Sequence, residues 1–163
     1  MKGLIYVYTG DGKGKTTAAI GTAIRAVGHG KRAVLIQFLK KGDYGEIKAS
    51  ILEVYQFGRK QFVLKPTEKD HELAEKALKF AEKILEEKPF LLILDEVNVA
   101  VSMGLINTRN VIDMVKKRGE TNIILTGRGA PEEFIEIADL VTEMKKIKHP
   151  FDEGVKGKEG LEY

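Results

Sequence analysis

Short apolar runs of strand length alternate along the chain with longer segments in which apolar residues recur at helical spacing. The runs predict strands at residues 4–8, 33–36, 53–57, 90–94, 122–125 and 140–144. The longer segments predict helices at residues 15–28, 45–52, 67–85, 108–118 and 131–138. Most of the strands are continuously apolar, a pattern typical of a parallel sheet that helices cover on both faces. The alternation therefore predicts a three-layer αβα fold with a mostly parallel sheet of about five or six strands.

The chain shows one domain and no obvious division. It has 163 residues, a common size for one domain, and it contains neither an internal repeat nor a segment of linker composition. The predicted helix at 67–85 has an apolar face, and its Glu- and Lys-rich face is expected to be solvated. Residues 58–66 and 145–163 show no clear period. We therefore expect a single domain over residues 1–163.

The composition of the chain excludes several classes of function. The chain has 27 basic and 24 acidic residues, and because these are interleaved we expect no nucleic-acid partner. It has no cysteine, which excludes disulfides, cysteine-bound zinc and thiol catalysis. No stretch approaches the roughly 20 apolar residues of a membrane span, and the first apolar run is too short for a signal peptide. These features predict a cytoplasmic protein that does not bind membranes.

The strongest motif lies between the first predicted strand and the first predicted helix. Its glycines allow the backbone to curl so that successive N–H groups face an anion, and the helix start adds the positive end of its dipole. A Gly-rich turn without a ligand is the alternative, which the Gly-Lys-Thr-Thr run makes a poor one. The motif predicts a P-loop NTPase (RecA-like) fold that binds ATP through residues Gly10, Asp11, Gly12, Lys13, Gly14, Lys15, Thr16 and Thr17.

Two residues of this loop have expected catalytic roles. Lys15 is expected to reach the phosphate oxygens, and the Thr16 hydroxyl to bind Mg²⁺. We also expect Lys15 to be exposed to solvent, so that its removal costs little stability. The usual loop spacing needs a glycine at position 9, where this chain has Thr9. Either Thr9 takes the first position, or the loop is a variant.

Acidic residues follow the most apolar predicted strand. Asp95 and Glu96 are expected at the carboxyl edge of the sheet, where open α/β sheets bind ligands and where they could hold a metal ion. A simple helix cap is the alternative for this pair. Arg128 follows another strand and could reach phosphate, or it could be a surface arginine in a turn.

The chain resembles the P-loop type of ATP:corrinoid adenosyltransferases of the cobalamin pathway. The resemblance runs in order through residues 9–17, 25–30, 37–40, 93–97, 125–128, 138–144, 148–152 and 160–163. The loop Gly-x-Gly-Lys-Gly-Lys-Thr-Thr is itself typical of that family, which supports the variant loop. Phe57 and Phe62 are approximate counterparts of a family aromatic segment, and the resemblance implies that they contact the corrinoid.

The resemblance implies a reaction. The 5′-deoxyadenosyl group of ATP passes to the cobalt of a reduced corrinoid, triphosphate is released, and adenosylcobalamin is the product. Metal ligands would be Thr16, Asp95 and Glu96, with Mg²⁺ or Mn²⁺ as the ion. The resemblance also implies a flavodoxin-like or flavin reductant and a homodimer.

Two other classes of ATP user remain open from the residues alone. A small P-loop kinase should show an arginine-rich lid and an acid poised for an acceptor hydroxyl, and no such arginine-rich segment is evident. A RecA-like ATPase that acts on nucleic acid should show a basic stripe, and the lysines here are scattered. Each class gives a different phosphate product: triphosphate, ADP, or ADP with phosphate.

Overall fold

The computed structural model describes residues 1–49, 51–60 and 63–162. Within these residues one six-stranded sheet has the order β3-β2-β4-β5-β1-β6. Every neighbouring pair of strands is parallel, as the continuous apolar runs predict. The strands are β1 (Ile5–Thr9), β2 (Ala33–Phe38), β3 (Glu53–Phe57), β4 (Leu91–Asp95), β5 (Asn122–Thr126) and β6 (Leu140–Glu143).

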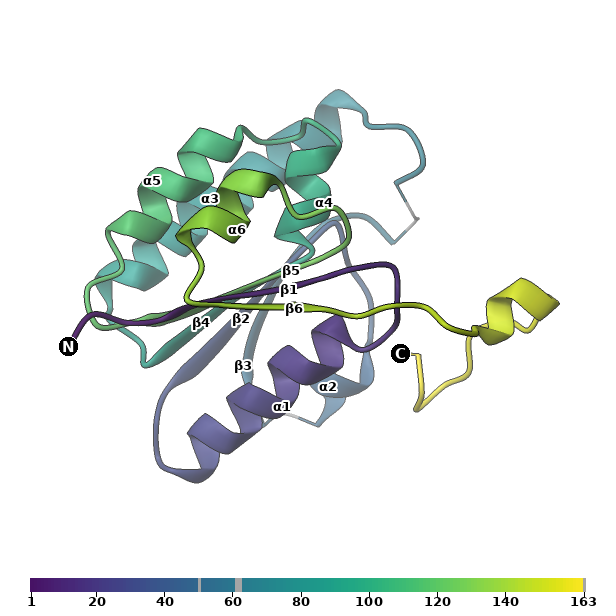
Figure 1. Ribbon diagram of the computed structural model, residues 1–163, viewed down its shortest axis with the longest axis horizontal. Coiled ribbons are helices and arrows are strands. Elements are labelled where there is room, and N and C mark those ends of the chain that lie inside the picture. The colour runs from purple at the N-terminus through teal and green to yellow at the C-terminus, as the bar shows by residue number, and fades with distance from the viewer. Residues whose placement is uncertain (50, 61–62, 163) are drawn as a thin grey trace.

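Helices cover both faces of the sheet (Figure 1). On one face lie α1 (Lys15–Gly28) and the short α2 (Gly45–Lys48). The other face carries α3 (Glu68–Glu86), α4 (Val97–Ser102), α5 (Thr108–Lys116) and α6 (Glu132–Ile137). This arrangement confirms the three-layer αβα prediction. None of the helices in the described parts of the chain is both long and apolar enough to cross a membrane.

Two apolar cores explain why the strands are continuously apolar. Successive side chains of a strand point to opposite faces, so Leu92 and Leu94 pack toward α3 while Leu91 and Ile93 pack toward α1. Helix α1 contributes small residues to its core, and these alanines let the helix approach the sheet closely: Ala19, Ala23 and Ala26. Both faces of the central strands are buried, and the buried polar residues of these strands, Gln37, Asp95 and Thr126, lie at their carboxyl ends.

The structure differs from the predicted elements in three places. Helix α4 begins directly after the acidic pair and was not predicted, because the valines of its six residues alternate and give no helical period. The last segment contains a 3₁₀ helix, η1 (Pro150–Glu153), where no element was predicted. The predicted helix at 45–52 is shorter, since α2 ends at Lys48.

A buried carboxylate links Arg59, just after β3, to the start of α3. Asp70 is almost fully buried, and its two carboxylate oxygens accept hydrogen bonds from Arg59 at 2.7 and 2.6 Å. The N–H and hydroxyl of Thr67 donate to the same side chain, which fastens the start of α3. Burial works to raise the pKa of Asp70, but the hydrogen bonds from Thr67 and Arg59 outweigh it and lower that pKa.

We expect Asp70→Asn to lower the free energy of unfolding by about 2–3 kcal/mol, because charged hydrogen bonds are lost at a buried position. The loss is measured as the shift of the urea midpoint at neutral pH. Since the folded pKa of Asp70 is lowered, its contribution is present at neutral pH and disappears as the pH falls through that pKa. The free energies of unfolding of the unmodified protein and of Asp70→Asn should therefore converge in acid.

The matched control is Glu72→Gln, on the exposed side of the same helix, where Glu72 pairs with Lys69 at 3.1 Å. An exposed pair of this kind contributes little, so the change should stay within about 0.5 kcal/mol. Equal effects of the two variants would contradict the role given to Asp70.

Candidate active site

The predicted phosphate loop connects β1 to α1 at the carboxyl edge of the sheet. Gly10 and Gly14 adopt positive φ angles of 96° and 115°, which side chains of other residues rarely tolerate. Gly14 is the residue that precedes the first turn of α1. The glycines therefore produce the curled backbone that the sequence predicts for anion binding.

The loop packs against the end of β6. The Gly12 N–H donates to the Met144 carbonyl at 2.6 Å, and the Met144 N–H donates to the Thr9 carbonyl at 2.8 Å. A Cβ atom on Gly10 or Gly12 would lie 2.5 or 2.6 Å from the Met144 oxygen, which is closer than real Cβ atoms come. These two glycines are therefore required by close backbone contact.

Thr9 has a role that the usual glycine could not perform. It is the last residue of β1, and its hydroxyl accepts a hydrogen bond from the Ala130 N–H at 3.1 Å. The loop thus stays attached to the segment that follows β5. This contact gives a physical reason for the departure from the common loop spacing.

Lys15 is buried, and the expectation that it is exposed was wrong. Only 8% of the residue is accessible, because its ammonium donates to the Gly10 and Gly12 carbonyls at 2.7 Å each. Burial is the main cause that lowers the pKa of Lys15, and the nearby Arg128 acts in the same direction. An ammonium group has three N–H donors, so one remains for a phosphate oxygen.

The start of α1 has the features of an anion site. Gly14 offers no side chain to cap the helix, and the first turn contains no acidic residue. The first N–H groups of a helix have no partner within it, and the helix dipole makes this end positive. A phosphate group is a suitable partner for both.

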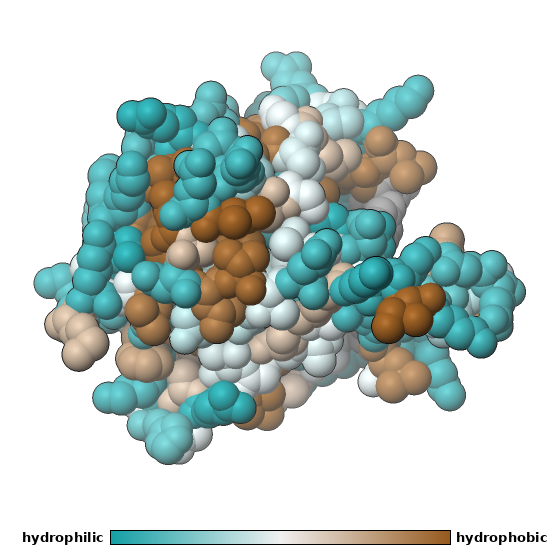
Figure 2. Space-filling view, viewed as in Figure 1, coloured by the Kyte–Doolittle hydropathy of each residue, from teal (hydrophilic) through white to brown (hydrophobic). Residues whose placement is uncertain are grey.

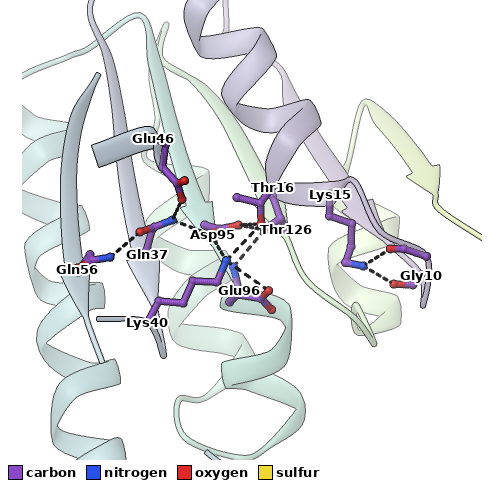
Figure 3. A network of polar contacts seen from close by, with 11 residues as sticks. Gly10, Lys15, Thr16, Gln37, Lys40, Glu46, Gln56, Asp95, Glu96 and Thr126 are labelled. Carbon is purple, nitrogen blue, oxygen red and sulfur yellow. Dashed lines mark hydrogen bonds and ion pairs between the residues drawn. The ribbon is translucent and has the colours of Figure 1, made fainter. Parts of the chain in front are cut away.

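Asp95 is the centre of the polar network in Figure 3. It is fully buried at the end of β4 and accepts hydrogen bonds from Thr16 at 2.7 Å and Thr126 at 2.6 Å on Oδ1. Its Oδ2 accepts from Lys40 at 2.9 Å and from Gln37 at 3.3 Å. The predicted pair of Thr16 and Asp95 is therefore in direct contact.

Glu96 lies beside this carboxylate at the start of α4, with a positive φ angle of 63°. Its N–H donates to the Thr126 hydroxyl at 3.1 Å, while its side chain makes no capping hydrogen bond to α4. Burial is the main cause that raises the pKa of Glu96, Lys40 opposes it, and Asp95 adds to it. These contacts do not support the helix-cap alternative for the acidic pair.

The side chains of Thr16, Asp95 and Glu96 offer hard oxygen ligands. The Thr16 hydroxyl and the carboxylates of Asp95 and Glu96 are typical Mg²⁺ ligands, which are completed by phosphate oxygens and water. The described residues contain no group of three histidine, cysteine or acidic side chains that could hold a metal by themselves. The donor set therefore fits a metal ion that binds together with a nucleotide.

The other residues predicted to bind the nucleotide are Arg128, Lys13, Asp11 and Thr17, and their surroundings differ. Arg128 is exposed after β5, and its positive charge helps to lower the pKa of Lys15 and opposes the raised pKa of Glu96. Lys13 instead forms an ion pair with Glu162 at 2.6 Å and donates to the Leu161 carbonyl at 2.7 Å. This contact brings the end of the chain to the phosphate loop. The remaining loop side chains, Asp11 and Thr17, are exposed.

The structure describes one of the two predicted corrinoid residues. Phe57 is partly buried at the end of β3, and its ring packs against Phe80 of α3 with centroids 5.4 Å apart. Phe62 lies outside the described residues. The structure therefore gives Phe57 a packing role, and its contact with a corrinoid stays a prediction.

Three residues of the network were missed from the sequence. Gln37, Lys40 and Thr126 all follow or end strands at the same sheet edge. Gln37 also donates to Glu46 at 2.9 Å and accepts from Gln56 at 3.0 Å. Polar residues at the ends of neighbouring apolar strands were the signal that could have identified them.

The fold and the loop together define a P-loop nucleotide-binding protein. A sequence model of one family, described as "ATP:corrinoid adenosyltransferase BtuR/CobO/CobP", matches residues 1–163. The chain belongs to this family, and both the resemblance and the class of enzyme expected from it are confirmed.

Individual relatives agree with the family match. The chain is 39% identical to the corrinoid adenosyltransferase of Sinorhizobium sp, over 99% of this chain and 81% of that protein. It is 35% identical to the corrinoid adenosyltransferase of Escherichia coli K12 and 36% identical to corrinoid adenosyltransferase CobA of Salmonella typhimurium. Both matches cover 99% of this chain and 86% of the relative.

We expect Gly12→Ala to destabilise the protein by about 1–3 kcal/mol, the usual cost of forcing a methyl group into a closely packed place. The cause is the contact with the Met144 carbonyl and not backbone strain, since Gly12 has no positive φ angle. Urea denaturation measures the change.

Gly21→Ala is the matched control, because Gly21 lies inside α1 with open space around its Cβ position. Alanine has the higher helix propensity, so this variant should gain about 0.5–1 kcal/mol. Changes of the same sign in both variants would contradict the close contact at Gly12.

Proposed function

We propose that this chain, as a single domain over residues 1–163, transfers the 5′-deoxyadenosyl group of ATP to the cobalt of a reduced corrinoid and releases triphosphate. The observation that supports it most directly is the glycine loop before an uncapped α1, beside the buried Asp95. The family match over the whole chain supplies the class of reaction. Adenosylcobalamin formation is the expected outcome.

This reaction needs neither a general base nor a nucleophile from the protein. The reduced cobalt is itself a strong nucleophile and attacks the 5′ carbon of ATP, while the electrons of the broken C–O bond leave with triphosphate. The chain has no cysteine, and the network around Asp95 contains no histidine. Its residues need only position ATP and stabilise negative charge on the leaving group.

Each part of the site has a task in that scheme. The loop N–H groups, Lys15 and Arg128 would bind the phosphate chain. Thr16, Asp95 and Glu96 would hold Mg²⁺ or Mn²⁺, which when bound neutralises charge on the phosphates. The burial of Lys15 makes its charge more effective, because fewer water molecules screen it.

Several partners implied by the resemblance remain proposals. Phe57 and Phe62 would contact the corrinoid, and a flavodoxin-like or flavin reductant would supply electrons. The cytoplasmic location also stays a prediction.

For the expected homodimer, the surface over α6 and the edge strand β6 is a candidate. Figure 2 shows apolar surface there. Its exposed side chains are Ile135, Leu140 and Val141.

We expect Lys15→Ala to lower the rate of corrinoid adenosylation by about 10²–10³, the usual effect of losing one preorganised charge contact. Because Lys15 also joins the Gly10 and Gly12 carbonyls, the variant should lose some stability as well. Rates are therefore measured at a temperature where urea denaturation shows the variant to be folded.

Lys116→Ala is the control, since Lys116 is an exposed lysine at the end of α5. It removes the same charge far from the loop and should leave the rate unchanged. Near-normal turnover by a folded Lys15→Ala variant would be inconsistent with the phosphate-loop role.

An ATP analogue with a non-hydrolysable β–γ bridge should still adenosylate the corrinoid. Attack falls on the 5′ carbon, so no phosphoanhydride bond has to break. A kinase or ATPase would be blocked by the same bridge. The measurement is single-turnover formation of the Co–C bond under strong reductant, followed by its absorption spectrum. The proposed reaction is wrong if the analogue competes with ATP but yields no alkylated corrinoid, while ATP yields ADP.

A further inference from the structure

Lys40 contacts every side chain that is proposed to hold the metal ion. Its ammonium lies 2.9 Å from Asp95 Oδ2, 3.4 Å from the Thr16 hydroxyl and 3.8 Å from Glu96 Oε1 (Figure 3). The side chain is mostly buried, with 23% of its surface accessible. A positive charge of the protein therefore occupies the centre of the proposed metal-ligand set.

An ammonium group and a divalent ion cannot share this place. Mg²⁺ binds its oxygen ligands at about 2.0–2.1 Å and needs their lone pairs, which Lys40 now engages through hydrogen bonds. The two cations would also repel each other strongly in a site with little water. Binding of the metal to these ligands therefore requires the Lys40 ammonium to leave.

We propose that Lys40 is an internal counter-cation that competes with the divalent metal for Asp95, Glu96 and Thr16. This inference rests on the proposed function, since it takes these residues as the metal ligands. Lys40 keeps the acidic pair neutralised when no metal is bound and weakens metal binding in the absence of nucleotide. When ATP arrives with the metal, its phosphates supply the further ligands that tip the competition, and they attract the displaced ammonium.

The backbone around Lys40 restricts the exchange to the side chain. The Leu39 N–H donates to the Phe57 carbonyl at 3.0 Å, and Leu39 has a positive φ angle of 62°. A Cβ on Gly58 would come within 2.3 Å of the backbone nitrogen of Lys40, so the two backbone segments are in close contact. The flexible four-carbon side chain can move while its Cα stays in place.

A second partner for the ammonium lies nearby. The centroid of the Tyr44 ring is 6.0 Å from the Lys40 Nζ, at the limit of a cation–π contact. Tyr44 precedes α2 and is partly exposed, so this side of Lys40 faces the surface. A rotation toward the ring would remove the ammonium from the carboxylates without leaving it unpartnered.

Asp95 would remain in place during the exchange. Thr126 donates to its Oδ1, and Gln37 donates to its Oδ2. Gln37 is itself fixed by Glu46 and Gln56, which bond to its amide. The carboxylate is therefore oriented by neutral donors, and Lys40 contributes the charge that a metal can replace.

The test is a titration with Mn²⁺ alone, without nucleotide, in which the electron paramagnetic resonance signal of free Mn²⁺ reports binding. Lys40→Met should bind Mn²⁺ about tenfold or more tightly than the unmodified protein, because a competing positive charge is gone. Lys41→Met is the matched control: it removes the same charge from the adjacent, exposed lysine and should bind like the unmodified protein. Unchanged or weaker binding by Lys40→Met would overturn the proposal.

Two further variants locate the effect. Adding Asp95→Asn to Lys40→Met should abolish the gain, whereas a gain that persists would show that the metal binds elsewhere and would overturn the proposal. Lys40→Arg retains the charge and should bind Mn²⁺ weakly, like the unmodified protein. Thermal unfolding followed by circular dichroism confirms that each variant is folded, and Lys40→Gln replaces Lys40→Met if the latter is not.

Failure of the reaction can be separated from failure of this inference. Corrinoid adenosylation by the unmodified protein is measured with ATP, and the Mn²⁺ titrations contain neither ATP nor corrinoid. Tighter Mn²⁺ binding by Lys40→Met, removed by Asp95→Asn, would support the competition even if no corrinoid were alkylated. Normal adenosylation with unchanged Mn²⁺ binding would overturn the competition and leave the reaction in place.

Discussion

A carboxylate with no solvent contact at the end of β4 determines how the rest of the site is arranged. Burying an ionised group without partners costs several kcal/mol, so Asp95 has to be surrounded by donors. These donors come from the start of α1 (Thr16), the end of β2 (Gln37), the turn after it (Lys40) and the end of β5 (Thr126). Satisfying one charge thus fixes α1, β2 and β5 relative to β4, and α1 is the helix that follows the phosphate loop.

The other side of the loop is fixed by backbone contact and not by charge. Met144 exchanges hydrogen bonds with Thr9 and Gly12, which joins the end of β6 to the loop. Glycine is needed there because any side chain would occupy the space of the Met144 carbonyl. Between these two attachments the loop has little freedom, as a site that binds a charged leaving group requires.

The sequence predicted those features that depend on apolar periodicity or on a local motif. The central strands are continuously apolar, the helices α1, α3 and α5 bury residues at helical spacing, and the loop residues are adjacent in the chain. Helix α4 escaped prediction because the alternating valines of Val97–Ser102 give no helical period. The exposure of Lys15 was predicted wrongly, because periodicity does not show that the loop carbonyls fold back onto its ammonium.

The missed residues depend on sheet register, which the sequence pattern does not contain. Gln37 is the direct partner of Asp95 in the pairing of β2 with β4. The two residues are 58 positions apart in the chain, so their contact follows only from the strand order. Lys40 reaches the same carboxylate because the chain turns just after β2. The sequence shows which side chains are polar, but it does not show that they meet at Asp95.

The uncapped start of α1 links the stability of the enzyme to the concentration of its substrate. A helix end with no capping side chain and no acid in its first turn gains a negatively charged partner when an anion binds. A ligand that binds only the folded state adds about 2.7 kcal/mol of stability at 100 times its dissociation constant. For a family that uses ATP, the folded fraction, and with it resistance to proteolysis, should rise with the energy charge of the cell. The loop would then act on the lifetime of the protein as well as on its chemistry.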